Sequence, residues 1–590
     1  MLIEEIKNLI EGEVSASEAD LTLFSHDASI FEVKPELVVK PKNVEDIKKL
    51  VSFVSEKKST QPGLSLTARA AGSDMTGGPL NESIILDFTA HFNKINEIVP
   101  ISPKFEKFGR EIEDPRFYSS DNVGGKIGSD DGYAVVEPGV FYRDFEKETL
   151  KKGLLFPSYP ASKSLCALGG IVANNAGGEK SLSYGKTEKY VRELNVVLSD
   201  GNEYVLHPLT PEQLEQKKSQ QNFEGQIYRE VHQLIESNYE AIQAAKPDVS
   251  KNSAGYALWD VWPARRSFSE GGDRKTFDLT RLFVGSQGTL GLVTKIKLDL
   301  VRTKKHSKLF VMFLRDLGPL GDLVNEVMKF KPESFEAYDD QTLKLAIRFF
   351  PDMVKKMKGN AFSLFLKFIP EAIMILTGGM PKLVLIAEFT GDDEEEIDRK
   401  LEEVRSQVRS KFHVKTLITH TAAEAEKYWT IRRESFSLLR KHVGDKHTAP
   451  FIDDVVVHIE QLPAFLPKLN ELVSQYKGLT YTIAGHAGDA NFHVIPLMDF
   501  RKEENRKAIP ELSEKVYELI ASMRGSITGE HNDGLIRTPY LKKMFSPEVL
   551  ELFDRTKTIF DPQNIFNPGK KVRGDFNYAM SHIRKSYESR

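Results

Sequence analysis

Two histidines and one acid stand in short glycine-rich segments of the second half of the chain. His486 and His493 flank the turn of the segment GHAGDANFH (485–493), and Glu530 follows Gly529 further on. Strand-like residues border the turn, so both imidazoles can converge. Two imidazoles and a carboxylate form an open divalent metal site. A histidine pair at this spacing is more often structural, and the H-E-x-x-H pattern is absent, so the residues alone leave both readings open.

Three glycine-rich loops indicate a second kind of chemistry. They are AAGSDMTGG (70–78), GGIVANNAGG (169–178) and GSQGTLG (285–291). Glycine lets a backbone press against a ligand and point its N–H groups at it. A single such loop is more often a tight turn, but three in one chain favour a cofactor site. No G-x-G-x-x-G follows a strand and no Walker loop occurs, so neither a Rossmann site nor a P-loop is predicted.

The pattern around the first loop predicts a β-α unit. Residues 37–39 form a short strand, and residues 44–54 form a helix that Asn43 caps, with apolar residues at helical spacing. Strands at 64–69 and 84–88 flank the loop. The loop therefore lies at a strand end, where α/β folds bind ligands.

The remaining elements predict a second domain. A strand at 133–136, a helix at 143–152, a hairpin through Asp200-Gly201 and a strand at 292–298 complete the first half. From residue 308 onward, strands and helices alternate again, and a helix that begins near residue 423 ends at Arg433. The polar stretch 208–279 is expected to be a solvated insertion; its basic pairs are Arg265, Arg266, Arg274 and Lys275.

The composition is that of an ordinary globular protein. The 590 residues exceed one hydrophobic core, so two or three domains are expected. With 40% hydrophobic residues, 28% charged residues and a net charge of -4, no nucleic-acid binding is expected. The single cysteine, Cys166, excludes an intramolecular disulfide and an iron–sulfur cluster held by this chain.

Two segments bear on location. Residues 1–7 carry acids where a signal peptide is basic, so we expect no export and a cytoplasmic protein. The apolar window 362–380 is broken by charged residues and proline, which argues against a spanning helix. A buried core helix is favoured, and a peripheral membrane patch is the alternative. The membrane patch would also include Phe349, Phe350, Lys355, Lys356 and Lys358.

The three loops, GHAGDANFH, the triplet Gly529-Glu530-His531 and the closing motif IFDPQNIFNPGK (559–570) resemble the FAD-linked oxidases of the vanillyl-alcohol oxidase and p-cresol methylhydroxylase type. Within them, the chain resembles the branch of D-lactate dehydrogenase, D-2-hydroxyglutarate dehydrogenase and the glycolate oxidase flavoprotein subunit. The resemblance runs from about Pro35 to Lys570.

The resemblance implies an α+β fold in three parts. Residues 1–305 would form a two-subdomain FAD-binding domain of the p-cresol methylhydroxylase type. Residues 306–558 would form a ferredoxin-like α/β cap domain that binds substrate and metal. Residues 559–590 would return to the FAD domain and end in a basic tail, which is expected to be solvated unless a separate iron–sulfur subunit docks there.

The resemblance also implies the cofactor contacts. Neither the first loop nor residues 156–178 contain a histidine for an 8α-histidyl link, so FAD is expected to be non-covalent. Tyr159 stands where relatives usually carry an aspartate. The residues expected to bind FAD are Ala71, Gly72, Ser73, Asp74, Thr76, Gly77, Gly78, Pro157, Pro160, Ser162, Cys166, Gly169, Gly170, Ala173, Asn174, Gly178, Tyr184, Gly288, Gly291, Val293 and Asn567.

For the chemistry, the resemblance implies zinc or manganese on His486, His493 and Glu530. His531 is then expected to be the general base, since a histidine beside a substrate alkoxide has a suitable pKa. Arg432 matches a W-x-x-R pattern whose guanidinium faces the substrate carboxylate, with an ordinary surface arginine as the alternative.

Three further residues follow from the same comparison. Asn491 shares a strand face with His493 and is expected to bond the substrate. Ala490 and Asn532 stand where relatives carry glycine; asparagine tolerates a left-handed backbone, whereas alanine could shift the turn.

The predicted activity is the oxidation of a D-2-hydroxy acid, D-lactate or a similar compound, to the 2-keto acid by hydride transfer to flavin. Electrons would pass to a quinone or to a separate iron–sulfur subunit. The alternatives are a non-redox flavin transferase of the alkylglycerone phosphate synthase type and a flavin electron-transfer subunit. In the 2-hydroxyglutarate enzymes a basic residue precedes the aspartate of the strand that here reads FIDDVVV (451–457); Ile452 and Asp453 weaken that assignment.

Overall fold

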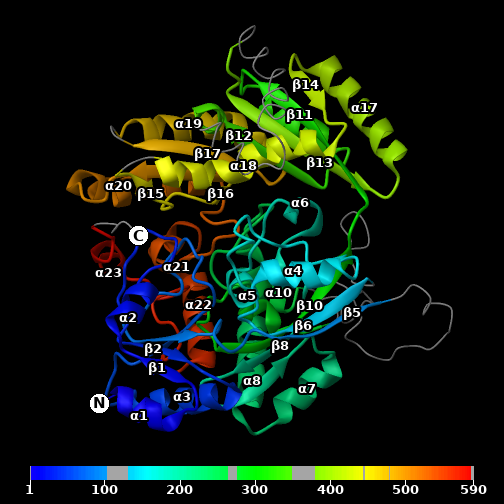
Figure 1. Ribbon diagram of the computed structural model, residues 1–590. Coiled ribbons are helices and arrows are strands. Elements are labelled where there is room, and N and C mark those ends of the chain that lie inside the picture. The colour runs from blue at the N-terminus through cyan, green and yellow to red at the C-terminus, as the bar shows by residue number, and fades with distance from the viewer. Residues whose placement is uncertain are drawn as a thin grey trace, which may run out of the picture.

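The computed structural model describes residues 2–101, 131–263, 276–348, 379–442, 445–476 and 479–585. The elements form two bodies, of which the lower holds both chain ends (Figure 1). Within these ranges, no helix has the length and apolar content needed to cross a membrane. Three sets of residues named above lie outside the described part: 362–378 of the apolar window, its aromatic and lysine neighbours, and the basic pairs 265–266 and 274–275.

The first sheet positions the first glycine loop. Its strand order is β1 (Glu13–Ser15), β2 (Leu37–Lys40), β4 (Ile84–Asp87) and β3 (Leu66–Arg69), with β2, β4 and β3 parallel. Helix α3 (Val44–Lys57) covers it with the apolar face that the spacing predicts, and Asn43 caps α3 by accepting the Asp46 N–H at 3.0 Å. Helices α1 (Leu2–Leu9) and α2 (Glu18–Phe24) precede this unit. The β-α prediction is confirmed, and the loop begins where β3 ends.

The second sheet positions the other two loops. It is antiparallel in the order β5 (Ile95–Pro100), β6 (Gly132–Val136), β10 (Leu292–Arg302), β8 (Val191–Val197) and β9 (Glu203–Leu206), and β7 (Leu154–Leu155) joins β10. Helix α4 (Tyr142–Leu150) lies between β6 and β7. The second loop differs from its prediction, because its first part is the helix α5 (Leu168–Asn174), which ends at Asn175 with φ +50°. The third loop follows α11 (Thr280–Phe283).

The expected solvated insertion is wrong for the described residues of 208–279. They form α7 (Pro211–Ser219), α8 (Phe223–Ser237), α9 (Tyr239–Ala244) and α10 (Leu258–Val261). Tyr228, Tyr256 and Trp259 are buried in the main core. The average composition hid the apolar face of α8, where Ile227, Val231 and Leu234 repeat at helical spacing.

The upper body contains the third sheet. Strands β11 (His306–Leu314), β12 (Ser334–Asp339), β13 (Leu383–Gly391) and β14 (Lys415–Ile418) lie in the antiparallel order β14-β11-β13-β12, the arrangement expected of a ferredoxin-like unit. Its helices are α12 (Leu320–Met328), α13 (Asp340–Arg348), α17 (Glu394–Lys411) and α18 (Ala422–His442). Helix α18 continues nine residues beyond its predicted end at Arg433.

The same sheet continues into the strands that bear the histidines. Next to β12 lie β17 (Thr480–His486) and β18 (Asn491–Met498), which pair with each other, and β15 (His447–Thr448) and β16 (Val455–Val456) pair with β18. Helices α19 (Leu462–Ser474) and α20 (Glu503–Ser522) cover this part.

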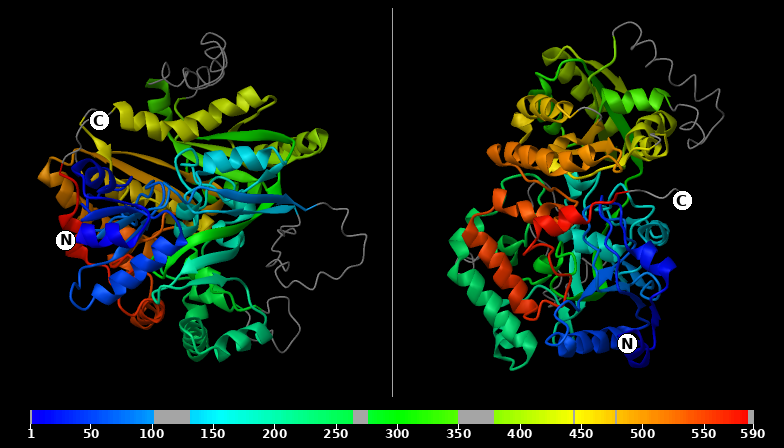
Figure 2. Two further views of the ribbon diagram at one scale, coloured as in Figure 1. Left: turned by 60° about the horizontal axis from the view of Figure 1, so that its bottom comes forward. Right: turned by 90° about the vertical axis from the view of Figure 1, so that its left-hand side faces the viewer.

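The C-terminal elements return to the lower body. Helices α21 (Gly534–Arg537), α22 (Pro547–Phe560) and α23 (Phe576–Ser581) lie beside the N-terminal elements in each view (Figures 1 and 2). The basic tail is not solvated throughout, because Lys571 is fully buried and its Nζ lies 2.7 Å from Oδ2 of Asp533. The predicted domain boundaries at 305/306 and 558/559 stay predictions.

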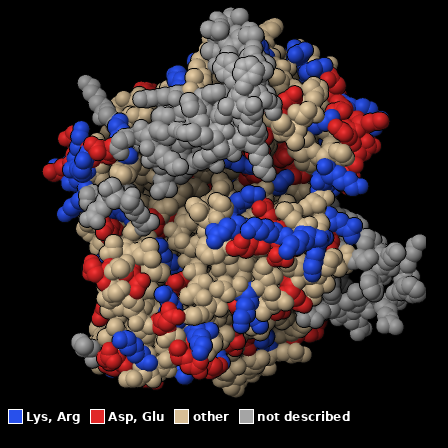
Figure 3. Space-filling model, in the orientation of Figure 1, with Lys and Arg blue, Asp and Glu red and all other residues tan. Residues whose placement is uncertain are grey.

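Ion pairs join the two bodies. Lys180, just before α6 (Ser181–Tyr184), pairs with Glu333 and lies 3.7 Å from Glu388 on the third sheet. Arg433 of α18 pairs with Glu179 at 2.6 Å. On the exposed face below this junction, Lys and Arg alternate with Asp and Glu over α4 (Figure 3). These ion pairs are contacts between the lower and the upper body.

Trp259 provides a test of the buried insertion. Its ring stacks on Phe545 with centroids 6.2 Å apart, and 4% of its surface is exposed. Trp259→Ala should lower the free energy of unfolding by about 3–5 kcal/mol, because it leaves a large cavity. Gln216→Ala, on the exposed side of α7, should change it by less than about 0.5 kcal/mol. Thermal melting of both variants measures this, and equal melting temperatures would contradict the buried insertion.

Candidate active site

Three predicted metal ligands converge. Nε2 of His486 lies 3.3 Å from Nε2 of His493 and 3.1 Å from Oε1 of Glu530, and Nε2 of His493 lies 3.5 Å from the same oxygen. The strand pair β17–β18 produces this arrangement, since His486 ends one strand and His493 lies near the start of the next. Nitrogen and oxygen ligands about 2.0–2.2 Å from one ion stand at such separations, so the donors fit a divalent cation.

A buried carboxylate lies behind each imidazole. Nδ1 of His486 lies 2.6 Å from Oε1 of Glu336, and Nδ1 of His493 lies 3.1 Å from Oδ1 of Asp453. Histidines that bind metals usually donate their second N–H to such a group, which turns the other nitrogen toward the ion. Burial raises the pKa of Glu336, but His486 and Arg432 outweigh it and hold the pKa at about 2. Burial lowers the pKa of His493, but Asp453 and Glu530 raise it to about 10.

His531 stands beside this centre. Its Nδ1 lies 2.8 Å from Oδ2 of Asp453, and its ring stacks on His493 with centroids 4.9 Å apart and planes 19° apart. Asp454, His493, Glu530 and His531 can bring one ligand atom each within 4.8 Å of one another. Burial lowers the pKa of His531, but Asp454 and Asp453 raise it on balance.

Arg432 and Asn491 adjoin the centre through other residues. Arg432 binds Glu336 through Nε and Nη2, each 3.0 Å from Oε2, so it connects to His486 through this acid. Asn491 is fully buried and its Nδ2 donates to Oδ1 of Asp454 at 3.0 Å. The substrate contacts expected of both stay predictions.

The three glycine loops meet around the side chains of Asp74, Asn174 and Gln287. Nδ2 of Asn174 donates to Oδ1 of Asp74 at 2.7 Å, and Nε2 of Gln287 lies 3.3 Å from Oδ1 of Asn174. Asn567 fastens the first and third loops, since its Nδ2 donates to the carbonyls of Gly78 at 2.9 Å and Gln287 at 2.7 Å. Segments far apart in sequence thus form one site.

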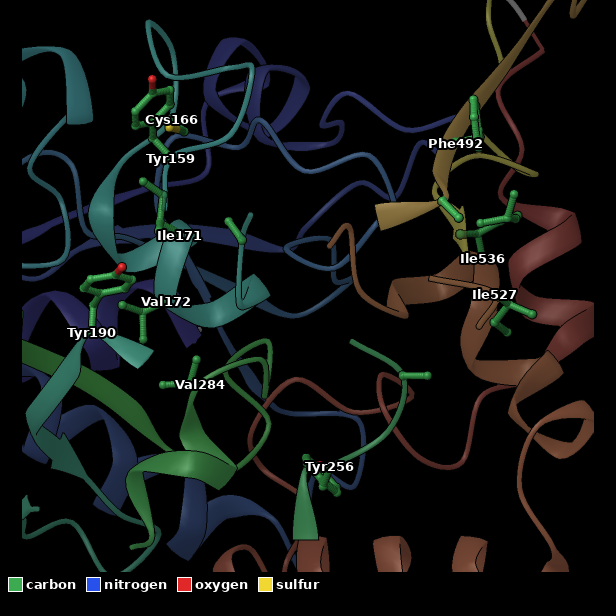
Figure 4. Close-up of a cluster of buried hydrophobic side chains, with 14 of the residues drawn as sticks. Tyr159, Cys166, Ile171, Val172, Tyr190, Tyr256, Val284, Phe492, Ile527 and Ile536 are labelled. Carbon is green, nitrogen blue, oxygen red and sulfur yellow. The ribbon is translucent and has the colours of Figure 1, made fainter. Parts of the chain in front are cut away.

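Residues 529–535, which we name the bridging segment, connect the metal-ligand cluster to all three loops. Leu535 N–H donates to the Thr76 carbonyl at 2.8 Å, and Gly534 N–H donates to Oε1 of Gln287 at 2.8 Å. Nδ2 of Asn532 donates to the carbonyl of Gly285 at 2.8 Å. In addition, a Cβ on Gly177 would lie 2.8 Å from Oε2 of Glu530, so the second loop abuts this acid. In Figure 4, Ile527 and Ile536 near this segment lie across from Ile171 and Val172 of α5.

The loops fit the predicted FAD. Residues 71–73 are half-buried, and within the described ranges their N–H groups have no protein acceptor. Consecutive free N–H groups form a nest for an anion such as a pyrophosphate. A Cβ on Gly170 would lie 3.6 Å from the Cβ of Ala70, so α5 and the first loop line one strip.

Other residues predicted to contact FAD are engaged in packing. Cys166 is buried in the core, and a Cβ on Gly178 would meet the Tyr159 carbonyl at 2.0 Å. Tyr184 reaches toward Glu333 of the upper body, with the hydroxyl 3.2 Å from Oε2. Their FAD contacts stay predictions.

Sequence reasoning missed several residues of the site. Lys251 comes from the supposed solvated insertion, and its Nζ lies 3.3 Å from Oε2 of Glu530. Glu336 lies in the middle of β12, where nothing in the sequence connects it to His486. Asp453 departs from the pattern of the 2-hydroxyglutarate enzymes, and this departure is the signal in the sequence for its position.

The two residues that stand where relatives carry glycine have left-handed backbone conformations. Ala490 has φ +48° and Asn532 has φ +72°. Asn532 compensates with side-chain bonds to Gly285 and to Nζ of Lys571, the latter at 2.7 Å. Ala490 is fully buried and closes the turn between the two histidines, whose Nε2 atoms lie 3.3 Å apart.

Comparison with known families identifies two regions of the chain. Residues 35–206 match the family described as FAD binding domain, and residues 303–571 match the family described as FAD linked oxidases, C-terminal domain. Together the matches cover both bodies.

Two named relatives align over nearly the whole chain. D-2-hydroxyglutarate dehydrogenase of Pseudomonas putida is 27% identical over 574 residues, which are 96% of this chain and 51% of that protein. The chain therefore spans about half the length of this relative. Glycolate oxidase subunit GlcD of Bacillus subtilis is 25% identical over 564 residues, which are 95% of this chain and 94% of that protein.

Solved structures share the fold. p-Cresol methylhydroxylase with substrate bound has a TM-score of 0.63 at 15% identity, covering 98% of this chain and 96% of that chain. Alkyldihydroxyacetonephosphate synthase has a TM-score of 0.61 at 13% identity, covering 96% of this chain and 84% of that chain. The predicted α+β fold with an FAD-binding domain of the p-cresol methylhydroxylase type is confirmed. The chain thus contains an FAD-binding domain at residues 35–206 and a C-terminal domain of the FAD-linked oxidases at residues 303–571.

Proposed function

We propose that this protein oxidises a D-2-hydroxy acid to the 2-keto acid with non-covalent FAD and one divalent metal ion, zinc or manganese. The observation that carries the proposal is the convergence of His486, His493 and Glu530 beside the second glycine loop. The relatives' names, a dehydrogenase and an oxidase subunit for small hydroxy acids, support the same reaction class.

The residues take separate roles in this reaction. When bound, FAD supplies the hydride acceptor for the α-carbon, and the divalent ion polarises the substrate hydroxyl. His531 accepts the hydroxyl proton at Nε2. Asp453 faces its Nδ1, which favours the tautomer with the proton on Nδ1 and a basic Nε2. Hydride and proton together account for the two electrons and two hydrogens that the hydroxy acid loses.

Arg432 has two proposed roles. Its bond to Glu336 keeps that acid ionised and oriented toward His486. It is also proposed to bind the substrate carboxylate, for which a planar guanidinium offers paired donors. Asn491 is proposed to bond the substrate from β18.

The acid at position 453 narrows the substrate class. In relatives specific for 2-hydroxyglutarate a basic residue precedes the aspartate of this strand, whereas Ile452 and Asp453 stand here and Asp453 faces two imidazoles. A second substrate carboxylate at this place would meet a like charge. We therefore propose a monocarboxylate such as D-lactate, with a quinone or a separate iron–sulfur subunit as electron acceptor.

The competing functions predict different outcomes. A non-redox transferase is favoured only by the fold that the chain shares with alkyldihydroxyacetonephosphate synthase. An electron-transfer subunit would need no metal site. Anaerobic mixing of the FAD-loaded protein with D-lactate or D-2-hydroxyglutarate should bleach the oxidised flavin absorbance, and neither alternative predicts this.

Loss of the metal ligands should separate cofactor binding from turnover. His486→Ala and Glu530→Gln should keep FAD and lose zinc or manganese by elemental analysis. Their flavin reduction should slow by at least about 100-fold, because the substrate hydroxyl is no longer polarised. His91→Ala is the matched control, since His91 pairs with Glu13 far from the site. Full flavin reduction in metal-free protein would refute the metal's role.

The general base has a distinct signature. His531→Gln should retain both FAD and metal, yet slow flavin reduction about 10²- to 10⁴-fold by stopped-flow absorbance. The loss should shrink as the pH rises, because hydroxide can then take the proton. A pH-independent loss would assign His531 to substrate binding instead.

Glu336 should make the stability of the fold depend on pH in the acidic range. Because its pKa falls from 4.5 to about 2 on folding, the ionised form stabilises the fold above about pH 4.5, and this contribution is lost as the pH falls toward 2. In metal-free protein, Glu336→Gln should cost on the order of 3 kcal/mol at pH 7. The difference in melting temperature from wild type should narrow below about pH 4.5. A constant difference across this range would contradict the ion-pair role.

A further inference from the structure

Lys251 enters the site from a part of the chain that contributes no other predicted functional residue. It lies between α9 and α10, and 2% of its side chain is exposed. Its Nζ lies 3.0 Å from Oδ2 of Asp489, in the turn between the two histidines, and 3.3 Å from Oε2 of Glu530. A buried ammonium thus lies between two acids of the centre.

The two oxygens of Glu530 have different partners. Oε1 faces Nε2 of His486 at 3.1 Å and Nε2 of His493 at 3.5 Å. Oε2 faces the ammonium of Lys251. Carboxylates bind divalent ions through one oxygen or through both. Here the second oxygen is already engaged, so Glu530 presents a single oxygen to the imidazoles.

The surrounding contacts hold Lys251 in this place. Ser250 Oγ donates to the carbonyl of Asp489. On the other side, Nζ of Lys186 donates to the carbonyls of Asn252 at 2.6 Å and Gly529 at 2.8 Å. The segment that carries Lys251 is therefore fastened both to the histidine turn and to the residue before Glu530.

We propose, resting on the proposed function, that Lys251 is a positioning residue that keeps Glu530 a one-oxygen ligand. A catalytic metal site must leave positions for the substrate. The ammonium of Lys251 keeps such positions open by binding Oε2 of Glu530. Its positive charge also repels a nearby divalent cation. Lys251 thus lowers the affinity of the site for metal and favours substrate access.

The test compares metal affinity in FAD-loaded, full-length variants, with Mn²⁺ as the probe and a competing chelator. Lys251→Met should bind Mn²⁺ about tenfold or more tightly than wild type, because Oε2 becomes available and the repelling charge is gone. Its KM for D-lactate should rise more than its kcat falls. Lys251→Arg retains a charged donor and should keep an affinity near that of wild type.

A double variant removes the main ambiguity. Lys251→Met leaves Asp489 unpaired, and that acid could itself attract Mn²⁺. In Lys251→Met/Asp489→Asn both charges are gone, which also protects the fold should the single variant be unstable. Tighter binding in this double variant supports the proposal. If only the single variant binds Mn²⁺ more tightly, the effect belongs to Asp489 and the proposal is overturned. Unchanged or weaker Mn²⁺ affinity in the variants also overturns the proposal.

The same titrations distinguish failure of the inference from failure of the proposed function. If wild type and Glu530→Gln bind Mn²⁺ alike, or neither binds it, the metal centre itself is refuted and the role of Lys251 falls with it. If wild type binds Mn²⁺ and Glu530→Gln does not, the metal centre is supported. The Mn²⁺ affinity of Lys251→Met then tests the role of Lys251 separately. FAD content and melting temperature establish that each variant is folded.

Discussion

The carboxylate of Asp454 is the interaction on which the site depends. Its Oδ2 accepts the backbone N–H groups of Glu530 at 2.8 Å and His531 at 2.7 Å, and the hydroxyl of Thr528 at 2.8 Å. Asp454 is fully buried and its backbone is left-handed, with φ +64°. Because bonds to a buried ionised acid are strong, one side chain fixes the turn that presents the acidic ligand and the adjacent imidazole. The bridging segment then continues from this turn to the glycine loops.

Much of the fold followed from periodicity. The spacing of apolar residues located α3, and the pattern of apolar and polar residues located β10. The prediction failed at α8, because the average composition of the long stretch 208–279 is polar and masked the buried apolar face of this helix. The sequence pattern also missed that α5 is helical, because glycines predict loops. Gly169 is a glycine because of close packing: a Cβ at this position would lie 2.6 Å from the Cβ of Pro138.

The site was only partly visible in the sequence. The convergence of His486, His493 and Glu530 was expected from residue types known to share an ion, and these three side chains do meet. Lys251 and Glu336 could not be found, because each acts through a partner more than a hundred residues away and carries no local motif. Long-range pairing of ordinary charged residues leaves no signature in one sequence.

The position of Asn567 has a consequence for how the protein matures. This residue, 489 positions after Gly78, joins Gly78 to the third loop, and Lys571 reaches back to Asn532. During synthesis on the ribosome, the first loop emerges long before the residue that clamps it. The first and third loops can therefore be fastened together only after Asn567 has been synthesised, so the complete pocket forms well after the first loop has emerged.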